Sequence, residues 1–388
     1  MMRRTLYAIS SLSILVGVWG LYLRLTTGHE LAAYGSYVVW GLWVAMYLFF
    51  VGTASGAFML ACLDFLFNVK AFAGTGRILL ATSLIALGAG LLSIWFDLGH
   101  LDRIWRVYLT PNPLSVMAQL VWGYTVFGLL TLLALISSMS SGANRRYLRA
   151  LIVVNLPIAV FLSGAAGALL GVETSRPFWH VGLFPVQFPV FSLASGGAAL
   201  LVAYWLIWDK SDESLRSRLR VVSLIVIALQ VVKLYFLWAD LSQSLYGGLP
   251  QNVRAVEAVL FGQYWWGFWI LQLGIGTFVP LAILLWAGAD RNWFALAGAL
   301  TLFGFAVARA NIIFPALTIP ELDALASAFV DPRLQFKYAP SLMEWALQVG
   351  IVGLAGLAFL IASDRLPLVQ PQAERVSGRV GITRVEEV

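Results

Sequence analysis

Ten apolar segments, each long enough to cross a lipid bilayer as a helix, dominate the sequence. They lie near residues 5–25, 38–67, 77–97, 114–138, 148–170, 182–207, 220–239, 266–288, 292–315 and 341–363. A bilayer core about 30 Å thick takes roughly 20 residues of helix. Only 11% of the residues are charged, whereas a soluble globular protein carries about 25%. The sequence therefore predicts an all-α, polytopic membrane protein with about ten transmembrane helices, and it excludes a water-soluble enzyme.

The distribution of basic residues predicts the orientation of these helices. Lys and Arg gather in the segments on the same side as the N-terminus, for example Arg145, Arg146, Arg149, Arg216 and Arg218. Cytoplasmic loops of membrane proteins carry such an excess. Both termini are therefore expected to be cytoplasmic, with the protein in the inner membrane of a prokaryotic cell. This bias also accounts for the net charge of +6, so no nucleic-acid partner is expected.

The first apolar segment allows two interpretations. It follows two basic residues, Arg3 and Arg4, as a signal peptide would. No small-residue cleavage site follows it cleanly, and Arg24 ends it as a membrane helix would end. We therefore expect an uncleaved first transmembrane helix.

Two short motifs recur at nearly the same spacing and suggest a duplication. Ala54-Ser55-Gly56-Ala57 recurs as Ala194-Ser195-Gly196-Gly197-Ala198, and Trp95-Phe96-Asp97-Leu98 as Trp238-Ala239-Asp240-Leu241. The motifs predict two parallel four-helix bundles plus one extra helix at each end. Chance similarity between helices rich in small residues is the alternative. The expected domains are 1–37 (first helix and outer loop), 38–175 (first bundle), 176–316 (second bundle), 317–364 (outer loop and last helix) and 365–388 (cytoplasmic tail).

Ionisable residues in or beside the apolar segments concentrate toward the outer side, with Asp64 at an inner helix end as the exception. A charged group in hydrocarbon costs at least a few kcal/mol, so each one suggests a functional or structural role. Lys233 and Asp240, and likewise Arg309 and Glu344, are expected either to form structural ion pairs or to contribute to a proton path. Asp97 either caps its helix and pairs with Arg103 or takes part in chemistry.

A second group of residues is expected to meet near the outer face. Tyr47, Asp97, His100 and Gln119 lie at similar predicted depth on three successive segments, and Trp43 and Trp122 lie close to them in the sequence. An aromatic belt at the membrane surface is the alternative explanation for the Trp residues. An aromatic-lined slot with a few polar groups fits a flat ligand that enters from the lipid.

The residues present argue against a redox centre within this protein. A haem in a membrane bundle needs axial ligands on facing helices, but His29, His100 and His180 are predicted in loops or at helix ends. With one cysteine, Cys62, an iron–sulfur cluster is not expected, nor is a metal site. Electrons would have to come from a bound molecule or a partner protein.

Several motifs resemble the NrfD/polysulfide reductase membrane-subunit family. They are Trp40-Gly41-Leu42-Trp43, Val51-Gly52-Thr53-Ala54-Ser55-Gly56-Ala57, Asp97-Leu98-Gly99-His100-Leu101-Asp102-Arg103, Pro111-Asn112-Pro113-Leu114-Ser115-Val116-Met117 and Arg176-Pro177-Phe178-Trp179. Arg309, Asn311, Tyr338-Ala339-Pro340-Ser341 and Glu344 are similar to the ten-helix branch, which includes the hydrogenase-2 membrane anchor and DsrP-type subunits.

The resemblance implies a quinone-reactive subunit of a respiratory oxidoreductase complex. Such subunits bind menaquinone or ubiquinone near the outer face. They anchor a ferredoxin-like iron–sulfur subunit and a catalytic subunit of molybdopterin or hydrogenase type on that side. This sequence departs from the family pattern in two places. Tyr47 and Val44 stand where some members have a histidine and an asparagine, and Gln119 stands where the hydrogenase anchor has a glutamate.

A specific site follows as a hypothesis. Tyr47 and His100 hydrogen-bond the quinone oxygens, Gln119 contacts the head group, and Asp97 exchanges protons with the outer water. Trp43 and Trp122 pack against the ring. The alternative function is a secondary transporter with its substrate site around Lys233 and Arg309, since parallel repeats and buried charges also occur in transporters. A purely structural anchor would not need Asp97 or His100.

Overall fold

The computed structural model describes residues 2–140, 144–208, 214–286, 290–331 and 333–369. Within these ranges the regular structure is entirely helical, and ten helices are long and apolar enough to cross a bilayer. The predictions of an all-α fold and of a multi-pass membrane protein are confirmed.

The long helices correspond to the ten apolar segments. They are α1 (Met2–Thr27), α2 (Leu42–Phe65), α3 (Gly76–Asp97), α5 (Val116–Met139), α6 (Arg145–Gly171), α7 (Phe184–Ile207), α8 (Ser214–Tyr246), the π-helix η3 (Gly267–Phe278) continued by α10 (Val279–Trp286), α11 (Arg291–Thr318) and α13 (Leu342–Arg365). The short ones are η1 (Lys70–Phe72), η2 (Leu101–Arg103), α4 (Arg106–Leu109), α9 (Pro250–Leu260) and α12 (Leu325–Ala328). Helix α8 exceeds the predicted 220–239 at both ends, because its polar first and last turns remain helical beyond the apolar core.

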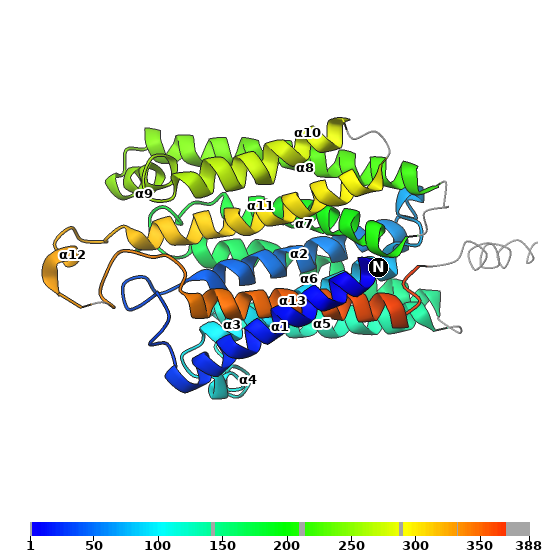
Figure 1. The fold of residues 1–388 in the computed structure, drawn as a ribbon, viewed down its shortest axis with the longest axis horizontal. Helices are drawn as coiled ribbons and strands as arrows, with labels where there is room; N and C mark the ends of the chain where they lie inside the picture. The colour runs from blue at the N-terminus through cyan, green and yellow to red at the C-terminus, as the bar shows by residue number, and fades with distance from the viewer. Residues whose placement is uncertain (1, 141–143, 209–213, 287–289, 332, 370–388) are drawn as a thin grey trace, which may run out of the picture.

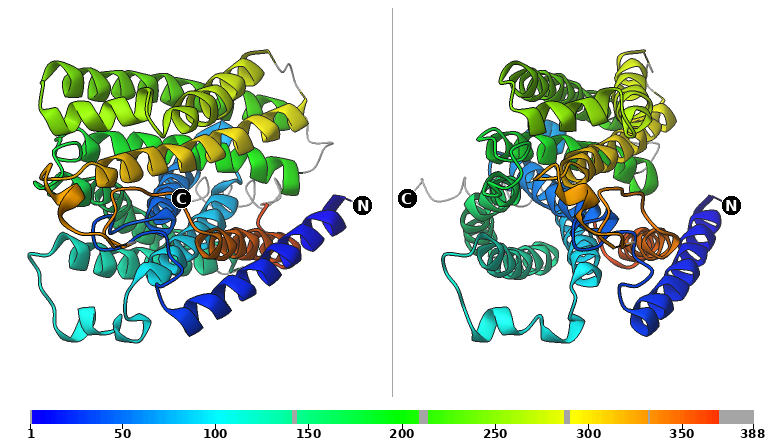
Figure 2. Two further views of the ribbon diagram at one scale, coloured as in Figure 1. Left: turned by 60° about the vertical axis from the view of Figure 1, so that its left-hand side comes forward. Right: turned by 90° about the vertical axis from the view of Figure 1, so that its left-hand side faces the viewer.

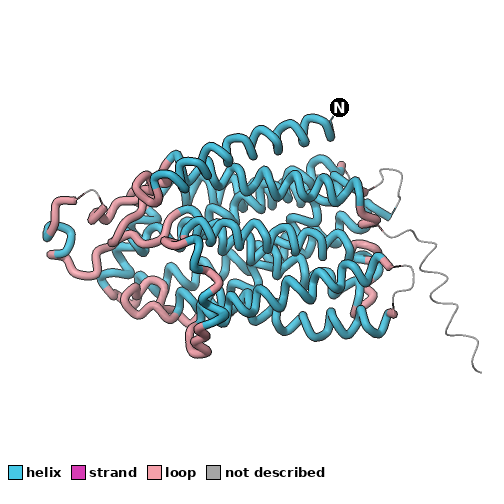
Figure 3. Tube along the Cα trace, turned by 90° about the horizontal axis from the view of Figure 1, so that it is seen from below, coloured by secondary structure: helices cyan, strands magenta, loops and turns pink. Residues whose placement is uncertain are grey.

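Successive long helices run in alternating directions through one elongated bundle (Figure 1). One end carries α4, α9, α12 and the loop of residues 28–41, and we call it the loop-rich end. Helix α1 begins at the opposite end, which we call the terminus end (Figures 1 and 2). Most of the non-helical chain gathers at the loop-rich end (Figure 3). Residues at that end are therefore the ones positioned to meet water or a partner protein.

The two copies of the small-residue motif pack against each other where α2 meets α7. A methyl group added at Gly56 would overlap the carbonyl group of Ser192, and one added at Gly196 would overlap the backbone of Gly56 and Ala57. Glycine is needed at both places because the two backbones touch. Helix α2 also packs on α3, and α7 also packs on α8 and α11. The repeated motifs thus join the two predicted bundles, whose boundaries remain a prediction.

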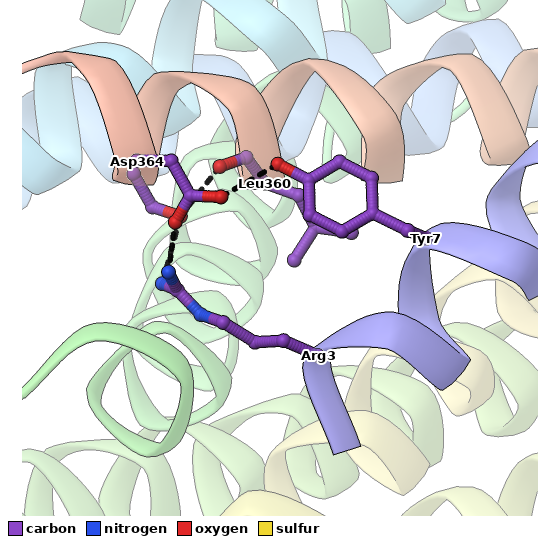
Figure 4. A network of polar contacts seen from close by, with 5 residues as sticks. Arg3, Tyr7, Leu360 and Asp364 are labelled. Carbon is purple, nitrogen blue, oxygen red and sulfur yellow. Dashed lines mark hydrogen bonds and ion pairs between the residues drawn. The ribbon is translucent and has the colours of Figure 1, made fainter. Parts of the chain in front are cut away.

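Helices α1 and α13 form a pair at the side of the molecule (Figure 2). Their backbones touch where Gly17 meets Gly350. At the terminus end, Asp364 of α13 forms an ion pair with Arg3 and accepts a hydrogen bond from the Tyr7 hydroxyl at 2.7 Å (Figure 4). Most of the remaining surface of α1 is exposed, as expected for a helix facing lipid.

Candidate functional site

At the loop-rich end, Arg24 of α1 caps the end of α3. Its Nε atom donates to the carbonyl of Phe96 at 3.0 Å, and its Nη2 atom donates to the carbonyl of Leu98 at 2.7 Å. These two carbonyls have no partner within their own helix, so the side chain supplies the missing donors. Asp97 lies between them as the last residue of α3. The capping contact brings a positive charge close to this carboxylate.

The loop of residues 28–41 then folds back over this helix end. Gly28 has a φ of +63°, a conformation that glycine adopts without strain and that lets the chain turn sharply after α1. The Tyr34 ring is buried, and it meets the rings of His29 and Trp43 edge-on at centroid distances of 5.4 and 6.0 Å. The loop thereby adds an imidazole and a phenol to the surroundings of Asp97.

Burial and charge set the protonation states of these two loop residues. Burial, reinforced by the negative charges of Asp97 and Glu344, raises the pKa of Tyr34 above its ordinary value. Burial, reinforced by the positive charge of Arg24, lowers the pKa of His29. At neutral pH the Tyr34 side chain is therefore a hydroxyl donor, and the His29 side chain is a neutral imidazole.

Four buried polar atoms in this region make no hydrogen bond of ordinary length and angle among the described residues, although the Tyr34 and Asp97 side chains lie close enough to influence each other. They are His29 Nε2, Tyr34 Oη, Asp97 Oδ1 and Gln348 Nε2. The Gln348 Oε1 atom accepts a hydrogen bond from Ser93 Oγ at 3.3 Å. Ser93 lies on α3, one helical turn before Asp97. Buried polar groups are normally paired, so four such atoms together indicate a site that binds polar atoms. We call His29, Tyr34, Asp97 and Gln348 the Asp97 cluster.

Glu344 is completely buried and acts as a structural acceptor beside this cluster. Its carboxylate accepts hydrogen bonds from the Tyr338 hydroxyl at 2.5 Å, the Ser341 amide at 2.8 Å and the Ala33 amide at 3.0 Å. The expected ion pair between Arg309 and Glu344 is wrong, because Glu344 is used to cap α13 and to hold the loop of residues 28–41. The Arg309 guanidinium instead stacks on the Phe188 ring at 3.6 Å.

Two other expected ion pairs are also wrong. Arg103 pairs with its neighbour Asp102 at 3.8 Å and not with Asp97. In the described part of the protein Lys233 and Asp240 form no ion pair, and the Lys233 amine donates to Thr277 Oγ1 at 2.7 Å. Residue spacing placed these side chains on the correct helices but did not predict the rotation of each helix.

The remaining predicted site residues at the loop-rich end do not hydrogen-bond to one another within the described ranges. The hydroxyls of Tyr47 and Tyr124 lie 2.9 Å apart inside the first bundle. Trp43 is fully buried, and its indole donates to the Glu344 carbonyl at 3.2 Å. Gln119 donates to the Pro113 carbonyl at 2.7 Å, and Trp122 donates to the Val107 carbonyl at 3.1 Å. His100 is exposed beside Asp102. Of these contacts, those of Gln119 and Trp122 hold the segment of residues 107–113 against α5.

Asp64 lies near the opposite end of the molecule, where α2 finishes. It accepts hydrogen bonds at 2.9 Å from the amides of Gly74 and Gly76, at the start of α3. A carboxylate at a helix N-terminus is stabilised by the helix dipole. This arrangement fixes the turn between α2 and α3.

With the geometry established, comparisons with known proteins identify the family. The sequence profile described as polysulphide reductase, NrfD, matches residues 30–321. The protein belongs to this family. It is 28% identical to one subunit of the selenate reductase from Mesobacillus selenatarsenatis, with 96% of both sequences matched. It is 26% identical to an Hdr-like menaquinol oxidoreductase integral membrane subunit from Archaeoglobus fulgidus, over 87% of this sequence and 86% of the relative. The protein NrfD from Escherichia coli is 26% identical, over 66% of this sequence and 87% of the relative.

Three members of the Asp97 cluster in this NrfD-family protein were not predicted as site residues. His29 and Tyr34 lie in a loop between two predicted helices, and Gln348 lies in the second turn of the last helix. Histidine and tyrosine are common in loops and glutamine is common in helices, so these residue types gave no signal. Nothing in their spacing shows that the loop of residues 28–41 folds back over α3. The available signal was a histidine close to Arg24, at the same end of the bundle as Asp97.

Proposed function

We propose that this NrfD-family protein is the quinone-reactive membrane subunit of a respiratory reductase complex. It would exchange electrons between menaquinone or ubiquinone in the bilayer and an iron–sulfur partner subunit. The observation that carries the proposal is the Asp97 cluster, with its four unpaired buried polar atoms at the end of the bundle. The names of the Archaeoglobus and Mesobacillus relatives support it. A secondary transporter is not favoured, since these relatives are named as oxidoreductase and reductase subunits.

The cluster supplies the groups that quinone chemistry requires. Oxidation of a quinol to a quinone releases two electrons and two protons, and the reverse reaction takes them up. Asp97 is proposed to accept or donate the protons, because its carboxylate is near the end of the membrane span and has an unpaired oxygen. The Tyr34 hydroxyl and the His29 imidazole are proposed to hydrogen-bond the quinone oxygens. His100, Gln119 and Trp122 would line the approach, while Tyr47 and Trp43 support the bundle behind it.

The loop-rich end is proposed to face outward, with both termini in the cytoplasm of a prokaryotic cell. Large apolar side chains are exposed there, including Tyr246, Phe261, Leu322, Phe329 and Val330. Exposed apolar surface at one end of a protein is a candidate for contact with a partner protein. We propose that a ferredoxin-like iron–sulfur subunit docks here and connects to a molybdopterin or hydrogenase-type catalytic subunit. Mass spectrometry of the gently extracted complex tests this, together with extraction of bound quinone.

Asp97→Asn is the variant that tests the proposed site. Asparagine keeps the size of the side chain but does not exchange a proton. Quinone-linked turnover of the complex should fall on the order of 100-fold or more. Reduction or oxidation of a soluble dye by the catalytic subunit should be unchanged, and all subunits should co-purify. The matched control is Asp102→Asn, an exposed carboxylate five residues away. Normal quinone-linked turnover in Asp97→Asn would overturn the assignment.

A further inference from the structure

The second half of the molecule contains a cavity, lined mostly by apolar side chains, that the proposed quinone site does not use. It has a volume of about 40 Å³ and lies between α7, α8, η3 and α11 toward the loop-rich end. Five of its lining side chains are polar: Gln187, Lys233, Asp240, Gln272 and Asn311. One water molecule needs roughly 10–15 Å³ measured this way, with two to four polar partners. The cavity therefore has room for about three waters.

Lys233 and Asp240 are the charged groups of this cavity. They lie two turns apart on one face of α8, and both are more than nine-tenths buried. The Lys233 amine has Thr277 Oγ1 as its hydrogen-bond partner, and Asp240 Oδ1 has no partner in the described part of the protein. The two groups do not pair directly. Water in the cavity would connect them by hydrogen bonds that the protein alone does not supply.

The other elements around the cavity contribute one further charged group. Arg309 of α11 is buried close to the cavity, with its guanidinium 5.6 Å from the centre of the Phe191 ring. Phe191 packs against Phe305, and the Lys233 amine lies 4.9 Å from the centre of the Phe305 ring. From α7 and η3 the cavity receives amide side chains, and from α9 it receives Val259. Glu257 of α9 is exposed. Lys233, Asp240 and Arg309 therefore determine the charge of this region.

A second, smaller cavity lies next to the first. It has a volume of about 10 Å³ and is lined by Arg176 and Glu321, among others. Phe178 lines both cavities. The Arg176 guanidinium and the Glu321 carboxylate lie 3.1 Å apart, and the Glu321 side chain is 43% exposed. Glu321 thus places a partly exposed carboxylate at the second cavity, which shares Phe178 with the first.

Toward the terminus end the polar side chains become fewer. The next buried polar side chain below Lys233 on α8 is Gln230, whose amide nitrogen donates weakly to the Gly276 carbonyl at 3.4 Å and to Thr301 Oγ1 at 3.5 Å. Val226 and Val222 follow as buried apolar residues, and the buried polar residues beyond Gln230 are Ser223 and Arg218. On α8 the lining of the cavity extends from Leu241 to Lys233 and no further toward the terminus end.

We propose that Lys233 and Asp240 form a hydrated proton-binding site in the second bundle, filled from the loop-rich end. The proton passes between external water and the Asp240 carboxylate or the Lys233 amine through the cavity waters, and no other bond changes. Each proton bound changes the charge of the bundle interior by one. The site is separate from the Asp97 cluster, and its existence does not depend on the proposed quinone function.

Infrared spectroscopy of the full-length protein in lipid nanodiscs tests this site directly. A protonated buried carboxyl gives a carbonyl band that disappears on ionisation, so a pH titration reports its protonation. We expect a band that is absent in Asp240→Asn and present in Asp323→Asn, a control at an exposed carboxylate near α9. Lys233→Met removes the positive charge two turns away on α8 and should move the titration of this band upward, because the ionised carboxylate loses a favourable interaction.

Two results would overturn the proposal. One is a spectrum in which no titrating band depends on Asp240, and the other is a band whose titration is unchanged in Lys233→Met. If Asp240→Asn does not fold, Asp240→Glu keeps the carboxyl and should retain a titrating band at a shifted frequency. Absence of such a band in a folded Asp240→Glu would count equally against the site.

Discussion

Asp97 and Asp240 occupy matching positions in the two halves of the molecule. Each lies toward the loop-rich end of its helix, two residues after a tryptophan, and each has a buried Oδ1 atom without a partner in the described ranges. Their surroundings differ, because Asp97 lies beside a loop tyrosine and Arg24, whereas Asp240 lines a cavity shared with Lys233. The carboxylates of the two recurring motifs thus lie in two different chemical environments.

Tyr34→Phe tests whether the loop tyrosine contacts the quinone. Removing the hydroxyl deletes one hydrogen bond but leaves the ring packing against His29 and Trp43. We expect the quinone-linked kcat/KM to fall about tenfold, equivalent to about 1.4 kcal/mol. Dye-linked activity should not change. Tyr37→Phe is the control, since the Tyr37 ring stacks on Phe336 away from the cluster. Equal quinone kinetics in the two variants would remove Tyr34 from the site.

His29 should make stability depend on pH. Its folded-state pKa lies below the ordinary value of 6.5. In acid the unfolded protein therefore gains a proton that the folded protein does not, and stability falls as the pH drops below about 6.5. Melting temperatures of the purified protein at pH 7.5 and pH 5.5 should differ by less in His29→Asn than in the parent. An identical pH response in both proteins would show that His29 does not contribute.

Glu344→Ala should loosen the loop of residues 28–41. The substitution leaves the buried Tyr338 hydroxyl and the Ala33 and Ser341 amides without their acceptor, at a cost of about 1–3 kcal/mol for each unpaired group. Hydrogen exchange measured by mass spectrometry should become faster in residues 30–42. The comparison variant is Glu30→Ala, because Glu30 is exposed in the same loop. Unchanged protection of that segment would contradict the role given to Glu344.

Gly56→Leu should prevent the two halves from packing. The added side chain has no space against the Ser192 carbonyl, so either α2 or α7 must move. We expect little folded protein, measured as the monodisperse fraction after detergent extraction. Gly88→Leu provides the control, because a methyl group added at Gly88 meets no atom within 4 Å. Similar yields of the two variants would show that the motif contact is dispensable.

The sequence predicted the helices well and their mutual contacts poorly. Apolar length and turn residues locate each span, so the ten helices followed directly from the pattern. The π-helix η3 was missed, because its apolar residues fit any helical winding. Asp97 was singled out from the sequence, and the structure places it beside Arg24 and Tyr34. Its neighbours His29 and Tyr34 depend on how one loop folds back, and the pairing of Glu344 depends on helix rotation. The pattern of apolar residues along the sequence predicts neither the fold of this loop nor the rotation of each helix.

The pairing of α1 with α13 has a consequence for how the protein is made. The ribosome produces α1 first and its main packing partner last, with eight other long helices between them. During that time α1 faces lipid or a membrane insertase. Polypeptides truncated before Leu342 lack the Gly350 contact and the Asp364 anchor, so the pair can form only after synthesis of the last helix. The ion pair between Arg3 and Asp364 can therefore form only after α13 has been synthesised.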